Sequence, residues 1–324
     1  MSTHRMHSLP DLVAAVPHLL GYSPTGLVTM GMDGHHFAGA MVYRESAEVL
    51  AADAQSLRYY LSRLVEAGAD GAVLLAVDAP DGSGLIDVAS RACESLGMAV
   101  HCRAIITGGQ VRDLDSGLAE PVPAASPALI EERSAARGGS PLMSREAVAQ
   151  SFEWDGKTWA AVELARDGHA LQEAVDAWVQ VLDPHGEPAE YLPVSTVAKA
   201  ASALLEIGTR DALLWQIVPG MEALGATLES SARTSVEKVP QTLPEDVGLV
   251  AERVRVMATH LSDKDAASTL TVAATLYWCA GDSTRAAIAL ERALRGDPTH
   301  RLARLTYGMV ASGVRFPEAV PTSA

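Results

Sequence analysis

The sequence predicts an N-terminal α/β domain with a mixed sheet, followed by an all-α domain. Residues 71–109 contain an apolar run, a glycine-containing turn, a helix-spaced segment and a second apolar run, which is the order of a βαβ unit. Asp33-Gly34 lies between two further apolar runs, as the turn of a β-hairpin does. After Ser144 the apolar residues follow helical spacing alone. We therefore expect two domains, at about residues 1–125 and 126–324.

The segment before the βαβ unit predicts a helix and then the hairpin. The helix is expected over residues 9–20, with Pro10 near its start and Gly21 after its end. The hairpin strands are expected at residues 27–32 and 37–43. Asp-Gly suits the turn between them because a type I′ turn requires positive φ at both central residues.

One amphipathic helix is expected between the hairpin and the βαβ unit. Ser46 is a suitable N-cap and Gly68 is a suitable C-terminal stop. Between them, apolar side chains recur every three or four residues and so form one buried stripe. These residues are Leu50, Ala54, Leu57, Leu61 and Leu64.

The βαβ unit contains two strands with different patterns. The first strand is the apolar run 72–77, and the second is the alternating run 98–106. With strict alternation, His101 and Arg103 point to one face and the apolar side chains point to the other. The apolar set is Met98, Val100, Cys102, Ala104 and Ile106.

The second half of the chain predicts helices alone. From Val111 to Ser140 the periodic pattern gives way to a Pro- and Ala-rich stretch, which we interpret as the domain boundary. Cap residues, among them Ser195 and Thr209, and glycine stops then divide the chain into helices. The expected helices are 145–152, 159–165, 171–182, 195–205, 211–218, 221–231, 245–261, 265–280, 283–295 and 299–312.

Composition limits the classes of function. The chain of 324 residues has a formal net charge of −15, which disfavours binding to nucleic-acid backbones and to anionic membranes. Its four lysines are Lys157, Lys199, Lys238 and Lys264. Since all of them follow residue 156, the α/β domain has neither a P-loop lysine nor a Schiff-base lysine.

Cysteine usage and hydropathy favour a cytoplasmic protein. Cys93, Cys102 and Cys279 are an odd number without a CxxC pair, which is typical of reduced thiols. The first residues lack the apolar segment of a signal peptide. No uninterrupted apolar run approaches the ~18 residues that a membrane span requires.

The last three helices show the spacing of a tetratricopeptide-repeat (TPR) hairpin. Small, aromatic, small, large, small and proline residues occur in the order that lets two antiparallel helices pack closely. One copy matches, so we expect a single TPR-like hairpin at about residues 265–312. The matching residues are Ala274, Tyr277, Ala286, Leu290, Ala293 and Pro298.

Several sequence blocks along the chain carry a family resemblance. They are Val16-Pro17-His18-Leu19-Leu20-Gly21-Tyr22-Ser23-Pro24 with Leu27-Val28, Ser144-Arg145-Glu146, Gly208-Thr209-Arg210-Asp211-Ala212-Leu213, Ala280-Gly281-Asp282, Ala286, Ala289-Leu290-Glu291-Arg292-Ala293-Leu294, Asp297-Pro298 and Leu302-Ala303. In this order the blocks resemble the actinobacterial family called domain of unknown function 4192. Gly26 departs from the family, which usually has serine before the Leu-Val strand. The resemblance covers nearly the whole chain and implies no established activity.

The turn after the first parallel strand is the candidate ligand site. Open α/β sheets bind ligands at the carboxyl ends of parallel strands, and the N–H groups of a helix start can hold an anion. This turn carries carboxylates and no cation, which opposes a phosphate and favours a ribose hydroxyl or a divalent cation. The alternative is an ordinary βα turn with Ser83 as the helix N-cap. The candidate residues are Asp78, Asp81, Gly82, Ser83 and Gly84, together with Thr107 and Gly108 after the next strand.

The sequence assigns no catalytic residue, metal site or cofactor. His35 and His36 are neighbours in a strand and so point to opposite faces, as do His101 and Cys102. Neither pair is therefore expected to hold a metal or to act as a catalytic pair. No GxSxG, HExxH, Walker A or kinase motif occurs, which favours a non-enzymatic protein.

Four residues of the helical half are candidates for interaction. Arg210 and Asp211 could form a docking pair, with a structural ion pair as the alternative. Tyr277 and Trp278 lie in the TPR-like hairpin, where packing against other helices is the alternative. The leading hypothesis is a cytoplasmic interaction or regulatory protein that binds a protein partner or itself. The rival hypothesis is a small-molecule-binding or enzymatic α/β protein that uses the turn at Asp78.

Overall fold

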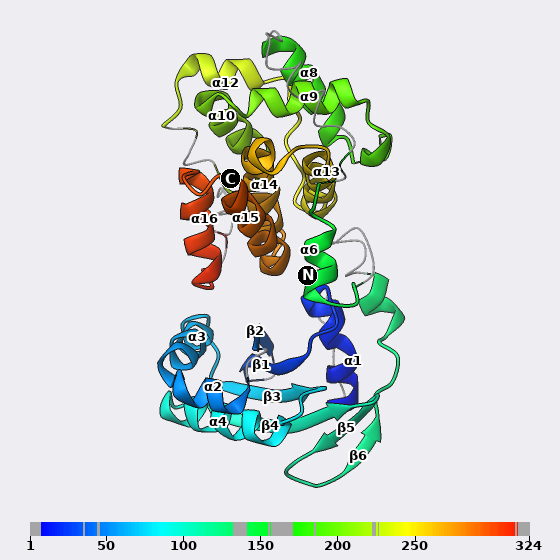
Figure 1. Cartoon of the computed structure of the whole chain (residues 1–324), viewed down its shortest axis with the longest axis vertical. Coiled ribbons are helices and arrows are strands. Elements are labelled where there is room, and N and C mark those ends of the chain that lie inside the picture. The colour runs from blue at the N-terminus through cyan, green and yellow to red at the C-terminus, as the bar shows by residue number, and fades with distance from the viewer. Residues whose placement is uncertain are drawn as a thin grey trace, which may run out of the picture. The chain divides into compact units, whose positions relative to one another are not determined.

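A computed structural model divides the chain into two compact units. Residues 1–133 with 140–145 form the first, here called the α/β unit, and residues 134–139 with 146–324 form the second, the helical unit (Figure 1). The expected fold class, a mixed sheet followed by helices, is confirmed. The structure describes residues 8–34, 36–43, 46–131, 141–154, 156, 171–184, 186–221, 225, 227–314 and 316.

The α/β unit is built on a six-stranded sheet in the order β2-β1-β3-β4-β5-β6. β3 and β4 are parallel and are connected by helix α4, whereas the other neighbouring strands are antiparallel. The expected hairpin and βαβ unit are therefore both present. The strands are β1 (Gly26–Asp33), β2 (His36–Tyr43), β3 (Gly71–Val77), β4 (Ala99–Thr107), β5 (Gln110–Asp113) and β6 (Ala119–Pro121).

Helices cover both faces of this sheet (Figure 1). The apolar side chains of α2, α3 and α4 form one core with one face, and those of α1 form a second core with the other. Because β3 is buried on both faces, its sequence is a continuous apolar run instead of an alternating one. The helices are α1 (Leu9–Leu20), α2 (Ala47–Ala52), α3 (Ala54–Glu66) and α4 (Gly82–Ser95).

Strand β4 departs from the alternation that the sequence predicts. Its pairing with β3 shifts so that Ala72 faces Val100 while Val73 faces Cys102, which leaves His101 as an extra residue in a bulge. A one-residue shift moves every later side chain to the opposite face. Val100 accordingly packs in the core under α2–α4, and Cys102 packs in the core under α1. The expectation of one apolar face along β4 is wrong.

The hairpin turn lies one residue later than expected. Asp33 ends β1 and pairs with His36, the first residue of β2, so residues 34–35 connect the strands. Gly34 has a φ of 55°, which a two-residue hairpin loop favours and which suits glycine. His35 lies outside the described residues.

The single helix expected after Ser46 is two helices. Asp53, with φ −108° and ψ 44°, ends α2 and precedes α3. Ser46 does act as an N-cap, because its Oγ accepts a hydrogen bond from the N–H of Val49 at 3.4 Å. Four residues of the predicted stripe, Leu50, Leu57, Leu61 and Leu64, are buried, whereas Ala54 at the start of α3 is exposed.

Strands β5 and β6 were not expected. They fall in the stretch after Val111 where the apolar periodicity disappears. Segments of four and three residues are too short to show alternation. The glycine turn after β4, rather than their own composition, positions them beside the sheet.

In the helical unit, every regular element among the described residues is a helix. Several helices begin at other residues than expected. α9 begins after Pro193, so Ser195 is no cap, and α10 begins at Ile207 with Glu206 as its N-cap, not Thr209. The helix expected at 221–231 lies partly outside the described residues, and α12 begins only at Ser230. The helix expected at 159–165 lies outside the described residues. The helices are α6 (Arg145–Gln150), α8 (Leu171–Leu182), a 3₁₀ turn (Ala189–Tyr191), α9 (Val194–Ala203), α10 (Ile207–Ile217), α12 (Ser230–Val236), α13 (Val247–Thr259), α14 (Asp263–Cys279), α15 (Ser283–Gly296) and α16 (Arg301–Ala311).

Helices α14, α15 and α16 pack beside one another (Figure 1). A three-residue turn, Ala280 to Asp282, joins α14 to α15, and Asp282 caps α15 by accepting the N–H of Arg285 at 3.0 Å. Five residues of the predicted TPR pattern are buried: Ala274, Tyr277, Ala286, Leu290 and Ala293. The TPR-like assignment itself stays a prediction.

Candidate functional site

Asp78 is the first residue beyond β3, at the edge where the sequence places a ligand. Its φ of 44° is the one positive value among the described non-glycine residues. The N–H of Asp78 donates to the carbonyl of Ile106 on β4 at 2.8 Å, which extends the parallel pairing by one residue. The side chain is exposed. A strained backbone at the end of a parallel strand is a feature that functional sites often show.

The carboxylate of Asp81 already forms a hydrogen bond within the α/β unit. It accepts this bond from the N–H of Ala47 at 2.5 Å. Ala47 is the first residue of α2, so this contact holds the start of α2 against the start of α4. The carboxylate thereby satisfies one of the N–H groups that a helix start leaves without an intrahelical partner.

Gly82 and Gly84 allow α4 to approach its neighbours closely. A Cβ on Gly82 would lie 3.1 Å from the Cβ of Ala76 on β3, and one on Gly84 would lie 3.0 Å from the Cβ of Ala47. Both glycines are thus explained by packing, without a ligand. Ser83 is exposed in the first turn of α4. The helix begins at Gly82, with Asp81 at the N-cap position, so the expectation that Ser83 is the N-cap is wrong.

Thr107 and Gly108 belong to a tight turn. Thr107 ends β4 and pairs with Gln110, the first residue of β5. Gly108 and Gly109 have φ values of 56° and 75°, as the two central residues of a type I′ hairpin do. Both predicted residues lie at the same end of the parallel pair as Asp78, and their conformation is accounted for by the turn.

The described residues were also compared with the requirements of a metal site. Within the described residues, no group of three or more His, Cys, Asp or Glu side chains is arranged to hold a metal ion. His101 lies against Gly71 of the neighbouring strand. The three cysteines are free, and burial raises the pKa of Cys93, Cys102 and Cys279 to about 11. Thiols with such pKa values are poor nucleophiles at neutral pH.

Arg210 and Asp211 pair with each other on α10. The Nε and Nη2 atoms of Arg210 donate to the same Asp211 oxygen, Oδ1, at 2.9 and 2.7 Å. Only 13% of the Arg210 side chain is exposed. This geometry agrees with the alternative of a structural ion pair that the sequence left open.

Tyr277 and Trp278 lie in the interior of the helical unit. Tyr277 donates its hydroxyl to Glu252 of α13 at 2.6 Å, and its ring lies 5.9 Å from that of Phe152. The indole N–H of Trp278 donates to the carbonyl of Val314 at 2.8 Å. Since both side chains are at most 5% exposed, a partner would contact other residues first.

The interior of the helical unit also contains arginines that the sequence analysis did not single out. Arg253 donates to the carbonyls of Gln180, Val181 and Glu187, where α8 ends. The last carbonyls of a helix lack intrahelical donors, and a guanidinium can satisfy several at once.

Arg292 donates hydrogen bonds to carbonyls at the end of α13, as Arg253 does at the end of α8. It donates to the carbonyls of Ala258 and Leu261 near the end of α13, to the carbonyl of Phe152, and to the carboxylate of Asp263. Its side chain is 2% exposed. The sequence signal for this role was its place on the apolar stripe of α15.

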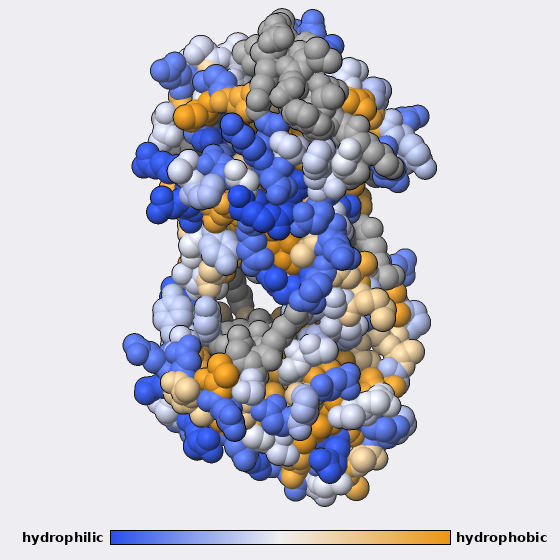
Figure 2. All heavy atoms as spheres, viewed as in Figure 1, coloured by the Kyte–Doolittle hydropathy of each residue, from blue (hydrophilic) through white to orange (hydrophobic). Residues whose placement is uncertain are grey.

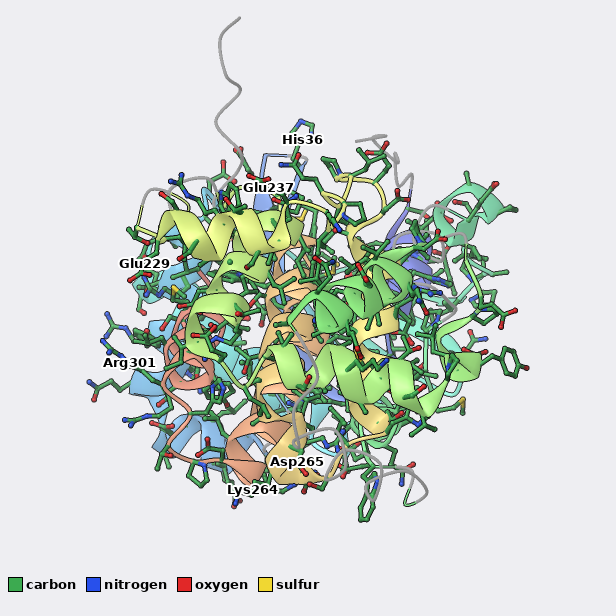
Figure 3. The ribbon with its side chains drawn as sticks, turned by 90° about the horizontal axis from the view of Figure 1, so that it is seen from above. His36, Glu229, Glu237, Lys264, Asp265 and Arg301 are labelled. Atoms are coloured by element: carbon green, nitrogen blue, oxygen red, sulfur yellow. The ribbon has the colours of Figure 1, made fainter. Side chains whose placement is uncertain are left out.

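A surface cavity of about 400 Å³ lies where α14 begins and α15 ends. Lys264 and Asp265 are in the first turn of α14, and Figure 3 shows the two side by side. The remaining lining residues include both a nucleophilic hydroxyl and a base. They are Leu205, Ala267, Ser268, Gly296, Asp297, Thr299 and His300.

Ser268 and His300 are 3.1 Å apart but are not arranged as a catalytic dyad. The Nδ1 of His300 accepts the N–H of Ala303 and thereby caps α16. The ring proton of a neutral His300 is therefore on Nε2, the atom that faces the Ser268 hydroxyl. A general base must present a lone pair to the nucleophile, and Nε2 presents a proton. Burial, and then the charge of Arg210, lower the pKa of His300, which keeps the ring neutral.

These features define a two-unit protein: a mixed α/β sheet with no assembled catalytic centre in its described part, and a helical unit whose mostly apolar interior includes buried arginines. A family model matches residues 10–316, so the chain belongs to the family described as domain of unknown function (DUF4192). No curated protein and no solved structure gives a significant match. Within the described residues, no helix has both the length and the apolar character needed to cross a bilayer.

Proposed function

We propose that this protein is a non-enzymatic interaction or regulatory module that binds a protein partner through its helical unit, in the cytoplasm. The observation that carries the proposal is the exposed face of α16, here called the α16 face. It consists of Arg301, Arg304, Leu305, Gly308 and Met309. The free state of the three cysteines supports the cytoplasmic assignment.

The α16 face has an apolar side. Leu305 is 57% exposed and Met309 is 40% exposed, four residues apart on one helix. The opposite side of α16 is buried through Ala303, Thr306 and Val310. Exposed apolar side chains at this spacing are the anchors that amphipathic helices use when they dock.

The α16 face also has a cationic side. Arg301 and Arg304 are exposed, and within the described residues neither has an ion-pair partner. Arg301 extends outward at the rim of the view in Figure 3. Figure 2 shows the chain from another side, where blue hydrophilic residues surround scattered hydrophobic ones over the helical unit.

The chemistry of this face indicates the partner. Two guanidinium groups that have no ion-pair partner among the described residues lie beside two apolar anchors, and together they complement an amphipathic segment that carries carboxylates next to apolar side chains. The rest of the chain is strongly acidic, with a formal net charge of −15, and would repel such a segment elsewhere. The TPR-like hairpin that supports α16 belongs to this proposal.

The proposal is tested by reversing the charge of the α16 face. The R301E/R304E variant should lose a partner that wild-type protein captures stoichiometrically from native lysate. The L305A/M309A variant should also weaken capture of that partner while leaving its salt dependence intact. Binding to wild type should weaken as salt rises, because steering by exposed charges is screened.

The matched control is R58E/R91E, which changes the charge by the same amount on exposed positions of the α/β unit. This variant should bind the partner as wild type does. If both double variants lose binding equally, the attraction is general and not local to α16. If purified wild type captures no stoichiometric partner, the proposal fails.

Binding of a small molecule at the α/β unit is the second candidate function, and the positive φ of Asp78 favours it. The ligand would contact the exposed carboxylate of Asp78 and would carry hydroxyl groups or be a divalent cation. A thermal-shift screen of nucleotides and divalent cations should raise the unfolding midpoint through binding. The D78N variant should lose that shift, and D87N, which alters another exposed carboxylate, should keep it. A flat screen counts against this function.

A further inference from the structure

Gly308 is a glycine that no contact within the described chain explains. It is exposed in α16, and an added Cβ would meet no described atom within 4 Å. Its φ is not among the positive values that favour glycine. Glycine destabilises a helix relative to alanine, because it loses more backbone freedom on folding. Glycine at position 308 therefore destabilises α16 without a compensating contact inside the described chain.

The other glycines of the helices described above are accounted for by their surroundings. Gly248 is buried in α13. At four further positions an added Cβ would lie 3.1 Å or less from another atom, so that glycine permits a close contact: Gly82, Gly84, Gly208 and Gly296. Gly308 differs from all of them, because the space in front of it is open.

Gly308 lies at the centre of the α16 face. With about 3.6 residues per turn, Arg301 and Gly308 fall nearly on one line along the helix. Leu305 and Met309 lie on one side of this line, and Arg304 lies on the other. The uncovered backbone at Gly308 is therefore a gap between the apolar side and the cationic side of the α16 face.

A gap of this kind suits a second helix. Side chains usually hold the axes of packed helices roughly 8–10 Å apart, and a glycine at the crossing point permits the shorter distances. A ridge of side chains on one helix then fits between the side chains of the other. An extended segment would contact the tips of Leu305 and Met309 and would not require an uncovered backbone beside them.

We propose that the partner segment is an α-helix that crosses α16 at Gly308. Its apolar side chains would pack on Leu305 and Met309, and its carboxylates would pair with Arg301 and Arg304. The inference rests on the partner-binding role proposed above for the α16 face. It adds the conformation of the partner segment and the point at which that segment crosses α16.

One methyl group should separate stability from binding. G308A should raise the melting midpoint, because alanine favours the helix and its Cβ meets no described atom. The same variant should weaken partner binding by at least about tenfold, because the methyl holds the two helix backbones apart. G308L should weaken binding further. A loss of binding in a variant that is more stable than wild type cannot come from misfolding.

The probe is the partner protein that wild type captures stoichiometrically, purified and titrated against the full chain by calorimetry. A54L is the control, since it adds bulk at an exposed helical position of the α/β unit and should bind as wild type does. If R301E/R304E loses the partner while G308A binds as wild type does, the crossing at Gly308 is wrong and the proposed function stands. Equal losses in G308A and A54L also overturn the inference. If wild type captures no partner, the proposed function fails and the inference fails with it.

The conformation of the partner segment is measured separately. A photo-reactive amino acid in place of Met309 marks the segment that contacts α16, and this segment is then synthesised as an isotopically labelled peptide. Bound to the full chain, the peptide should show the Cα chemical shifts of a helix. A proline at its centre should abolish binding, whereas a proline at its first residue should not. Extended chemical shifts, or binding that a central proline leaves unchanged, overturn the proposal.

Discussion

The two units bury polar groups in different ways. Where the structure describes side chains of the α/β unit, the buried polar ones are the hydroxyls of Thr29 and Ser90. In the helical unit, Arg253, Arg285 and Arg292 are buried as well. The difference follows from the backbone. A sheet satisfies its N–H and C=O groups by pairing strands, whereas each helix ends with carbonyls that need donors from elsewhere.

This contrast indicates which substitutions should destabilise each unit most. The α/β unit depends on apolar packing on both faces of β3, and a lost contact there leaves a cavity. The helical unit depends in addition on a few guanidinium groups that each serve several carbonyls. Removing one of these should leave buried acceptors without donors, which costs more than the loss of one typical hydrogen bond. The following predictions test this contrast, from the largest expected effect to the smallest.

Substitution of Arg292 should give the largest loss of stability. R292M removes donors to three backbone carbonyls, at roughly 1–3 kcal/mol for each group that stays buried, so we expect roughly 3–5 kcal/mol in all. R292K should rescue little, because an ammonium lacks the fork that reaches several acceptors at once. Urea unfolding measures the free energy. Arg295 is the control: it pairs with Glu153 and Asp263 but its side chain is 53% exposed, so R295M should cost less than about 1 kcal/mol. Equal losses for Arg292 and Arg295 would contradict the special role of buried guanidinium groups in the helical unit.

Gly296 and Gly308 should respond to alanine in opposite directions. At Gly296 an added Cβ would overlap the backbone carbonyl of Asp263, where α15 ends against the start of α14. G296A should therefore destabilise the protein by about 2 kcal/mol or more. At Gly308, in α16, no atom lies within 4 Å of an added Cβ, so G308A should stabilise by ~0.5–1 kcal/mol through helix propensity. Thermal melts of both variants decide the signs. A neutral G296A would mean that the α14–α15 contact is looser than described.

Replacing Thr29 by an apolar residue should increase the stability of the α/β unit. The Oγ1 of Thr29 is buried in β1 and has no hydrogen-bond partner among the residues that the structure describes. T29V should raise the free energy of unfolding by about 1 kcal/mol, because it removes an unsatisfied hydroxyl at nearly constant shape. Thr271 of α14 is the matched control: its hydroxyl donates to the carbonyl of Ala267 at 2.7 Å, so T271V should destabilise slightly. A loss of stability in T29V would contradict the description of this site.

The pH dependence of stability should carry a contribution from His300. Its pKa is lowered from the ordinary 6.5 by burial and by Arg210, so the unfolded chain binds the proton more readily than the folded one. The stabilising contribution is therefore complete above about pH 6.5 and declines as the pH falls below that value. The H300N variant keeps a side chain that can cap α16 and should give a flatter profile between pH 7 and 5.5. Parallel profiles for wild type and variant would show that His300 titrates normally.

Hydrophobic periodicity and turn residues predicted the order of most helices and strands. They did not predict local irregularities such as a β-bulge. The hairpin followed from Asp33-Gly34 and the βαβ unit from its two apolar runs. The bulge at His101 could not be predicted, because it depends on the register between β3 and β4 and changes no composition. The strands β5 and β6 could not be predicted either, because they are too short to show an alternating pattern.

The sequence predicted that the candidate turn follows the first parallel strand. It did not predict the backbone conformation and the contacts of the residues in that turn. Asp78 was placed correctly after β3, but its backbone conformation has no sequence signature, and the use of Asp81 by Ala47 depends on how α2 meets α4. Gly82 and Gly84 suggested a ligand-binding turn, and close packing of helices accounts for them equally well. The cavity beside His300 joins residues of α14 with residues between the end of α15 and the start of α16, which sequence spacing alone does not bring together.

The contact of Arg292 with the carbonyl of Phe152 spans 140 residues of sequence. It ties the segment after α6 to the last helices, and Arg255 makes a similar contact with the carbonyl of Ser151. A fragment that contains only the α14–α16 region would lose the acceptors that these arginines serve. The helical unit is therefore expected to unfold cooperatively, and a truncated version suitable for expression should begin ahead of α6.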